Sequence, residues 1–523
     1  MSIDLSLDRI RQLLDHLPIP YTRPTIHVAG TNGKGSVCAL VASILSAASP
    51  PLVVGRFNSP HLLSPLDGIF VRNEPVDRHI FMEAREEVQR RNEEHCCGAT
   101  SFEMYTCYAL LIFERLKVDV VVLEVGMGGR LDATNVVPDE SILISALTSV
   151  DLDHQAFLGD TVEAITREKA AIARRGKPFV VGPQAHQQVE AVARSIIHSS
   201  GAEIAVPCAV VAVDWDPDLD GAPVPTQTGI RVPQFQPVHI HRPCHADPIR
   251  ALLPLHGEHQ LGNLDTAMGI ISALQTHPAC ERPGLNFDQR LTPDAISRGI
   301  RATRWPGRLS YHAILLSPAS LGTSAIATHE HTDPESSQIL VLADGAHNPA
   351  SAAALAAYIT STLGKSGGGP VALTYILALS HSPPKTPEQT LKPLLAIREG
   401  LPHKRELRLG VALLPFTPPL GMPWIKFVPP SDIRAAVDSL VPPSSVEILE
   451  SSSDFDGLDY QEAPIPVEPP RTDHVEEALR WAASRRRHGE DSLVVLAGSL
   501  YLVADFYRLL QELGQAGDIW GSS

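Results

Sequence analysis

The sequence predicts an α/β fold made of two domains, each with a parallel β-sheet covered by helices. The chain has 523 residues, which is too long for a single hydrophobic core. Short apolar runs alternate with helical patterns from residue 25 to about 182, and a second series of the same kind begins after Arg308. Near-continuous apolar strands separated by helices are typical of parallel sheets that are buried on both faces.

The first domain is expected to span residues 1–306. An amphipathic helix is expected at its start, with one apolar face formed by Leu7, Ile10, Leu13 and Leu14. After a strand that begins at Thr25, the further expected strands are Leu52–Phe57, Val118–Glu124, Ser141–Leu147 and Pro178–Val181. The expected helices are His79–Glu93, Phe102–Leu116, Thr161–Arg174 and one that reaches Ala273. Residues 205–250 lack a clean period and are expected to be an insertion with some β-structure.

The second domain is expected to span residues 307–523 and to be a smaller α/β unit. Its expected strands are Ile339–Ala343, Leu373–Leu379, Leu407–Leu414 and Leu493–Ala497. Its expected helices are Pro349–Leu363, Asp432–Leu440, Asp473–Ser484 and Leu500–Leu513. Two stretches, near 381–405 and 442–470, are expected to be loop insertions, since low-complexity segments rich in Ser and Pro begin or fill them.

Composition excludes several classes of partner and compartment. The formal net charge is −16, which argues against nucleic acid or an anionic membrane as the main partner. The seven cysteines are scattered without a C-x-x-C motif, as expected for reduced thiols. The N-terminus carries two acids in its first eight residues, unlike a secretory or mitochondrial leader, and no apolar run is long enough to span a membrane. We therefore expect a cytoplasmic protein, and we expect it to be a monomer.

A glycine-rich turn between the first strand and an apolar helix is the strongest chemical signal in the chain. It consists of Gly30, Thr31, Asn32, Gly33, Lys34, Gly35 and Ser36. Glycines let the backbone approach phosphate oxygens closely, the helix N-terminus attracts anions, and a lysine neutralises the far end of a triphosphate. The spacing departs from the common G-x-x-x-x-G-K-[ST] pattern, because Val28 replaces its first glycine and Gly35 separates Lys34 from Ser36. The turn predicts a nucleotide site.

The other suggestive segments also follow predicted strands. They are Ser59–His61, Glu124–Asn135 and Ser149–His154. Because ligands of open parallel sheets bind beyond the carboxyl ends of the strands, we expect these segments to gather beside the glycine-rich turn.

Three of these residues are candidate ligands of Mg²⁺. Glu124 ends an apolar strand, and its carboxylate is the kind of oxygen ligand that Mg²⁺ prefers. His154 follows the next expected strand, and Ser59 follows the strand before. Each residue also has a purely structural interpretation. Glu124 could simply end its strand, His154 could be a surface or core histidine with its hydrogen bonds satisfied, and Ser59 could be a turn residue.

Other polar residues have weaker signals on their own. Lys169 lies inside an expected helix among charged neighbours, so a solvated helical lysine is the interpretation that the sequence alone favours. Asp132 is a candidate polar loop residue. In the second domain, Asp344-Gly-Ala-His347-Asn follows a strand and precedes a helix, which suggests a group that reaches toward a ligand.

Seven separated motifs together resemble the folylpolyglutamate synthase and dihydrofolate synthase branch of the Mur ligase family. Five are Gly30–Ser36, Ser59–Leu62, Glu124–Asn135, Asp153–Gly159 and Arg167–Lys169; the last two are Trp305–Arg308 and Asp344–Asn348. The resemblance implies a P-loop-type ATPase domain followed by a Rossmann-like domain. It also implies ATP-dependent ligation of glutamate to a pteroate through an acyl phosphate.

The resemblance also implies roles for individual residues. The loop Gly30–Ser36 would hold the β- and γ-phosphates of ATP, and Asn263, Arg308, Asp344 and His347 would contact the nucleotide. Ser59, Glu124 and His154 would coordinate Mg²⁺. Lys169 matches a lysine that is carbamylated in the family, where it becomes a ligand of a second Mg²⁺, and this reverses the solvated interpretation. Asp132 matches a residue near the pterin-bearing substrate. The implied catalytic group is Lys34, Glu124, His154 and Lys169.

Three functions remain open at this stage. The first is a dihydrofolate synthase. Gly421–Trp424 and Ala497–Tyr501 resemble fungal members, and Leu66–Ile69 departs from the Arg-Glu-Arg-Ile of eukaryotic polyglutamylating enzymes. The second is a folylpolyglutamate synthase that adds glutamate to reduced folates, alone or in a bifunctional enzyme. The third is a non-catalytic nucleotide-binding regulator, which would not need the full set of polar residues.

Overall fold

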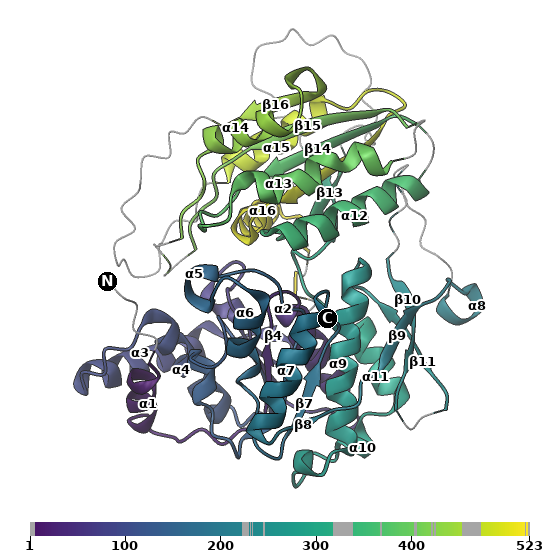
Figure 1. Ribbon diagram of the computed structural model, residues 1–523. Coiled ribbons are helices and arrows are strands. Elements are labelled where there is room, and N and C mark those ends of the chain that lie inside the picture. Colours follow the sequence, from purple (N-terminus) through teal and green to yellow (C-terminus); the bar gives the residue numbers. More distant parts are fainter. Residues whose placement is uncertain are drawn as a thin grey trace. The chain divides into compact units, whose positions relative to one another are not determined.

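The computed structural model describes residues 6–221, 230, 232, 234–243, 246–316, 338–366, 369–401, 405–419, 422, 425–451, 472–517 and 519–520. The chain forms two compact units (Figure 1). Unit 1 comprises Met1–Pro223, Gln234–Trp305 and Trp520–Ser523, and unit 2 comprises Val224–Pro233 and Pro306–Ile519. Each unit is α/β, as the sequence predicts.

Unit 1 is built on an eight-stranded sheet whose central strands are parallel. The strand order is β4-β3-β2-β5-β1-β6-β7-β8. The bounds are β1 Thr25–Ala29, β2 Val54–Phe57, β3 Ile69–Val71, β4 Glu74–Pro75, β5 Val120–Glu124, β6 Ile142–Leu147, β7 Pro178–Val181 and β8 Glu203–Ile204. Strands β3 and β4 form an antiparallel hairpin at one edge, and β3 also pairs antiparallel with β2. The other neighbouring strands pair in parallel. The carboxyl ends of β1, β2, β5 and β6 therefore meet at one edge of the sheet.

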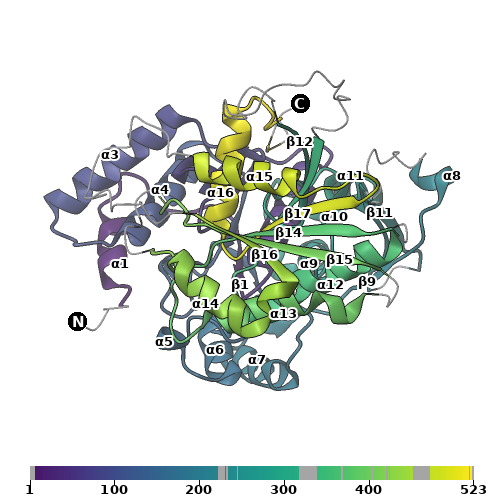
Figure 2. The ribbon, with the colours of Figure 1, turned by 90° about the horizontal axis from the view of Figure 1, so that it is seen from above.

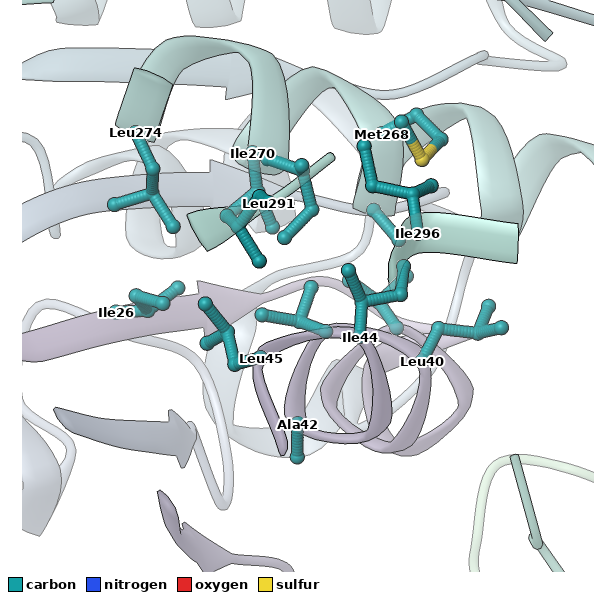
Figure 3. Close-up of a cluster of buried hydrophobic side chains, with 14 of the residues drawn as sticks. Ile26, Leu40, Ala42, Ile44, Leu45, Met268, Ile270, Leu274, Leu291 and Ile296 are labelled. Atoms are coloured by element: carbon teal, nitrogen blue, oxygen red, sulfur yellow. The ribbon is translucent and has the colours of Figure 1, made fainter. Parts of the chain in front are cut away.

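Helices cover both faces of this sheet. One face packs under α2 (Lys34–Ser46), α9 (Glu258–Thr276) and α11 (Pro293–Arg301), where leucine, isoleucine and methionine side chains interdigitate (Figure 3). The other face packs under α1 (Asp8–Asp15), α3 (Arg78–Glu94), α4 (Ser101–Arg115), α6 (Val162–Ala170) and α7 (Gln187–Ser200). Successive side chains of β5 point to opposite faces of the sheet: Val122 packs on the α2 side, and Leu123 packs on the α4 side.

A small antiparallel sheet extends unit 1. It consists of β9 (Ala209–Ala212), β10 (Gln236–His241) and β11 (Ile249–Leu253) in the order β11-β10-β9. The expected β-structure within 205–250 is therefore present. The described residues of this unit also form the short α-helices α5 (Gln155–Leu158), α8 (Pro217–Asp220) and α10 (Phe287–Arg290).

Unit 2 is a six-stranded sheet in the order β12-β13-β17-β14-β15-β16. The strands are β12 Ser310–Leu315, β13 Gln338–Ala343, β14 Val371–Leu377, β15 Leu407–Leu413, β16 Val446–Glu450 and β17 Asp491–Ala497, and all pairs except β12–β13 are parallel. Figure 2 shows α12 (Pro349–Lys365), α13 (Pro387–Leu395) and α14 (Pro430–Leu440) along one face, and α15 (Asp473–Ser484) and α16 (Leu500–Glu512) along the other.

Three expectations about insertions were wrong in part. Residues 387–395 form helix α13 because Thr390, Leu391, Leu394 and Leu395 make a buried stripe. Residues 446–450 form strand β16, which pairs with β15. Ile230, which lies within the expected insertion, is buried in the core of unit 2, and Val232 packs against that core. Only Met422 of the stretch 421–424 is described, so that fungal-type pattern lies outside the described residues, as do 452–470.

None of the described helices is both long and apolar enough to cross a membrane.

Candidate active site

The glycine-rich turn connects β1 to α2, and its geometry requires glycine at two positions. Gly30 has φ 150°, and a Cβ there would lie 1.8 Å from Thr148 Oγ1. Gly33 has φ 91° and caps α2, and a Cβ there would lie 2.1 Å from Asn263 Oδ1. The N–H groups of the first turn of a helix have no partner within the helix, so the start of α2 offers donors to an anion.

The turn is tied to the segment that follows β6. The amides of Thr31 and Asn32 both donate to the carbonyl oxygen of Ser149, at 2.8 and 3.1 Å. Thr148 Oγ1 donates to the carbonyl oxygen of Asn32 at 2.8 Å. Thr31 Oγ1 donates to the carbonyl oxygen of Asp151 at 3.1 Å and accepts from its amide at 3.1 Å. Two strand ends thus form one preorganised rim.

A cation and a carboxylate face each other beside this turn. Lys34 Nζ lies 3.9 Å from Glu124 Oε1, and both side chains are largely buried. Asn58 Nδ2 donates to Glu124 Oε2 at 2.7 Å, which fixes the carboxylate at the end of β5. Ser59 follows Asn58 directly and is half-buried. The carboxyl ends of β1, β2 and β5 therefore contribute to one site.

Lys169 is buried, which contradicts the solvated interpretation that the sequence alone favours. It is 2% exposed, and its Nζ donates to the carbonyl oxygen of Gly30 at 2.9 Å. Val162, Ile165, Thr166 and Lys169 form the buried face of α6, at the i, i+3, i+4, i+7 spacing of a helix. Burial, with a smaller contribution from the charge of Lys34, lowers the pKa of Lys169 to about 7.

His154 is exposed, unlike these buried groups. It caps the short helix α5 with φ 51°, and its amide donates to Asp153 Oδ1 at 2.9 Å. The structure therefore brings Lys34, Glu124 and Lys169 against the turn, and it places His154 on the surface of the neighbouring loop.

Asp132 organises the loop that follows β5. Its buried carboxylate accepts hydrogen bonds from the amide of Met127 at 2.8 Å, from the amide of Thr134 at 3.0 Å and from Thr134 Oγ1 at 2.6 Å. Thr134 Oγ1 also lies 2.8 Å from Nε2 of the buried His27. Burial raises the pKa of Asp132 and lowers the pKa of His27 to about 3. His27 is thus neutral, and its Nε2–H donates to Thr134.

Asn263 lies on α9 against Gly33, and a neighbouring glutamine holds it. Asn263 Nδ2 donates to Gln260 Oε1 at 2.8 Å, and Gln260 Nε2 donates to Ser36 Oγ at 3.4 Å. Sequence reasoning gave no role to Gln260 or to Asn58. Two features of the sequence could have pointed to these roles. Gln260 and Asn263 have the i, i+3 spacing that places both on one helix face, and Asn58 directly precedes Ser59.

The candidate residues of unit 2 cluster at the carboxyl end of β13. Arg308 Nη1 donates to the carbonyl oxygen of Gly307 at 2.9 Å, and His347 Nδ1 donates to that of Gly345 at 3.0 Å. A Cβ at Gly345 would lie 2.7 Å from Arg308 Nη1. The buried Asp344 accepts from the amides of Leu309 and Ala346, at 2.8 Å each. Asp344 thus shapes the turn that carries the half-buried Arg308 and the exposed His347.

Glu124 and Ser59 of unit 1 carry the oxygen donors that a hard divalent cation prefers, whereas His154 is an exposed nitrogen donor. Glu124 supplies a carboxylate, Ser59 a hydroxyl and His154 an imidazole, and oxygen donors suit Mg²⁺. The part of the chain that the structure describes contains no cluster of three or more His, Cys, Asp or Glu side chains arranged for a metal. The expected set includes only two side chains of those types, Glu124 and His154.

Comparison with known proteins decides the family. Residues 327–509 match the family model "Dihydrofolate synthetase, C-terminal domain". The chain is 32% identical over 436 residues to the dihydrofolate synthetase of Saccharomyces cerevisiae. The aligned residues cover 83% of this chain and 86% of the yeast protein. The chain belongs to the dihydrofolate synthase and folylpolyglutamate synthase family of Mur-type ligases.

Two further members of the family match almost end to end. The probable dihydrofolate synthetase of Schizosaccharomyces pombe is 29% identical over 513 residues, 98% of this chain and 99% of that protein. A solved bifunctional folylpolyglutamate synthase/dihydrofolate synthase "with Mn, AMPPNP and L-Glutamate bound" superimposes with a TM-score of 0.64. It is 25% identical and covers 98% of this chain and 95% of that chain. The two-domain α/β fold of the dihydrofolate synthase family is therefore the fold of this chain.

Proposed function

We propose that the chain is a dihydrofolate synthase, an ATP-dependent ligase that joins L-glutamate to 7,8-dihydropteroate and gives dihydrofolate, ADP and phosphate. The observation that carries the ATP-dependent step is the Lys34–Glu124 pair beside a turn whose Gly30 and Gly33 admit no side chain. The identity with the yeast dihydrofolate synthetase supports the choice of acceptor and product.

Phosphoryl transfer comes first in the proposed reaction. The turn amides and Lys34 bind the β- and γ-phosphates and neutralise the charge that develops while the pteroate carboxylate attacks the γ-phosphorus. The acceptor carboxylate thereby becomes an acyl phosphate, and ADP leaves. Glu124, with Ser59 and His154, would hold Mg²⁺, which would supply electrostatic stabilisation to the phosphates.

Amide formation follows. The amino group of glutamate attacks the acyl carbon, and the tetrahedral intermediate collapses to an amide with loss of phosphate and a proton. We place the acceptor beside the loop that follows Glu124. The carboxylate of Asp132 holds this loop in shape by accepting hydrogen bonds from Met127 and Thr134. Asn263, Arg308, Asp344 and His347 keep the nucleotide-contact roles that the family resemblance implies for each of them.

Lys169 is proposed to work as a carbamate. Its neutral amine would add to CO₂ and release one proton, which turns a cation into an anionic oxygen ligand for a second Mg²⁺. Its burial and its pKa of about 7 support this proposal, because a lysine reacts with CO₂ only while it is neutral.

A folylpolyglutamate synthase is the second candidate. The dihydrofolate synthase/folylpolyglutamate synthase of Haemophilus influenzae is 42% identical to this chain over 184 residues, which is 34% of this chain. One assay separates the two functions: purified protein with ATP, Mg²⁺ and L-glutamate receives either 7,8-dihydropteroate or a reduced folate. Turnover with dihydropteroate alone supports a dihydrofolate synthase, and turnover with folate alone supports the second candidate. Turnover with both indicates a bifunctional enzyme.

A further inference from the structure

Arg56 is a buried cation in β2 that forms no ion pair with a described residue, although Glu124 is near enough to act on its pKa. The residue is 4% exposed, and its Nε makes no hydrogen bond. None of the ion pairs among the described residues includes Arg56. Two other arginines of unit 1 with little exposed side chain do have carboxylate partners, since Arg23 pairs with Glu114 at 3.1 Å and Arg174 pairs with Asp139 at 2.6 Å.

Two aromatic rings hold the guanidinium of Arg56. Its Cζ lies 4.0 Å from the ring centroid of Phe70 and 5.1 Å from that of Trp305. Phe70 stands directly opposite Arg56 in the β2–β3 hairpin. Such cation–π contacts stabilise the charge through the flat faces of the guanidinium, whereas its five N–H groups point outward in its plane. The rings therefore fix the orientation of Arg56 without using its donors.

Arg56 also lies beside the phosphate-binding turn. It is two residues after Val54 in β2, so its side chain emerges on the α2 face of the sheet. Trp305, one of its two rings, contacts the turn, since a Cβ at Gly35 would lie 2.4 Å from Trp305 Cζ2. Cys38, one turn into α2, is close enough to Arg56, Glu124 and Lys34 for all three charges to influence its pKa.

We propose that Arg56 binds an oxyanion of one substrate of the ligation through its in-plane N–H groups. The inference rests on the proposed function. Its chemistry fits a phosphoryl group of ATP or a carboxylate of L-glutamate or dihydropteroate, because the planar fork of arginine matches both in a bidentate manner. A buried cation that makes no ion pair gains most from such a partner. Arg56 is then a substrate-binding residue supplied by β2, in addition to the turn and Lys34.

Substitution at Arg56 and separate binding measurements test this proposal. R56M keeps the apolar stem and removes the charge, and R56K keeps the charge but loses the planar fork. R242M is the matched control, because Arg242 is also buried, at 8% exposure, and follows β10 in the small antiparallel sheet. Calorimetry measures the affinity of each folded variant for AMPPNP with Mg²⁺, for L-glutamate and for 7,8-dihydropteroate, each alone and in the presence of the others.

We expect R56M to weaken the binding of one of the three ligands by ~10- to 100-fold, as loss of charge-assisted hydrogen bonds does. The affected ligand identifies the source of the oxyanion. R56K is expected to recover part of the loss, and R242M to bind all three as the wild type does. Unchanged affinities in R56M would overturn the proposal. An equal loss for all three ligands with a lower melting temperature would also overturn it, because it would assign Arg56 a structural role only.

A measurement on the wild type covers the case in which R56M does not fold. The Nε–H resonance of Arg56 in ¹⁵N-arginine-labelled protein, assigned from its absence in R56K, is expected to shift on addition of the ligand that Arg56 binds. No shift with any of the three ligands would contradict the proposal. If the wild type forms no dihydrofolate, the proposed function fails, but this resonance still reports whether Arg56 binds the nucleotide or glutamate.

Discussion

Lys169 Nζ donates a hydrogen bond of 2.9 Å to the carbonyl oxygen of Gly30, the first residue of the glycine-rich turn. A lysine from α6 thus supports the backbone turn that follows β1, at the edge where Lys34 and Glu124 also lie. The same burial that makes this contact possible removes the ammonium from water, and this lowers the pKa of Lys169 to about 7. The contact is therefore formed at a cost to stability, as is common at functional sites.

The first prediction concerns stability against pH. The unfolded chain binds a proton at Lys169 up to its ordinary pKa of 10.5, whereas the folded chain releases it near pH 7. Between these two pKa values the unfolded state binds more protons than the folded state, so Lys169 makes the free energy of unfolding rise with pH. Below pH 7 the folded protein bears the full free-energy cost of a buried, protonated Lys169. We expect K169M to be more stable than the wild type at pH 6.5, with about 5 kcal/mol as the upper bound set by the pKa difference.

Urea unfolding at pH 6.5 and pH 9.5, in a buffer free of CO₂ and nucleotide, measures this effect. The stability difference between K169M and the wild type should shrink at the higher pH. A difference that is the same at both pH values would show that Lys169 is not held with a lowered pKa.

The second prediction concerns the functional form of Lys169. If the carbamate is the active form, K169A should lose most activity, by ~100-fold or more, because an anionic ligand is lost. Short carboxylates should restore part of the activity. A carbamate carbon should appear in the NMR spectrum of the wild type with ¹³C-bicarbonate and Mg²⁺-nucleotide, and not in that of K169A. An active enzyme without this signal, in which carboxylates rescue nothing, would refute carbamylation.

The third prediction concerns Lys34. K34A should fold normally and lose activity by at least ~100-fold, because its ammonium neutralises phosphate charge at the edge of the turn. K365A is the matched control, since Lys365 is an exposed lysine in the last turn of α12. The steady-state rate of ADP release measures both variants. Near-normal turnover by folded K34A would remove the turn lysine from the mechanism.

The fourth prediction concerns Glu124. E124Q keeps the hydrogen-bonding shape beside Asn58 but loses the charge that attracts a hard cation. Its Mg²⁺ requirement should rise by ~10-fold or more and its maximal rate should fall, whereas E93Q, on the exposed end of α3, should behave as the wild type. A Mg²⁺ titration of activity provides the comparison. Identical titration curves for E124Q and the wild type would exclude Glu124 as the metal ligand.

The sequence predicts the two α/β units and most central strands because buried parallel strands and their helices carry strong periodic signals. The strand β7 and the helix α15 match their predicted bounds, Pro178–Val181 and Asp473–Ser484. The helix α13 and the strand β16 were missed. A proline-rich composition hid the buried stripe of α13, and β16 is a short edge strand whose pattern is only partly apolar.

In the candidate site, too, some features follow from the sequence pattern and others do not. Strand-end position predicts that Lys34 and Glu124 gather at one edge, since the topology of a parallel sheet dictates it. The burial of Lys169 depends on which face of α6 packs inward, and charged neighbours on both sides concealed that face. The roles of Asn58 and Gln260 depend on side-chain contacts between elements far apart in the chain, which no local pattern encodes.

The ligation itself tests the central proposal most directly. Purified protein with ATP, Mg²⁺, L-glutamate and 7,8-dihydropteroate is assayed for dihydrofolate and ADP together, with each substrate omitted in turn. The account predicts equal amounts of dihydrofolate and ADP, and no dihydrofolate when any component is missing. ATP consumption without dihydrofolate, or no ATP consumption in the complete mixture by folded, nucleotide-binding protein, would contradict it.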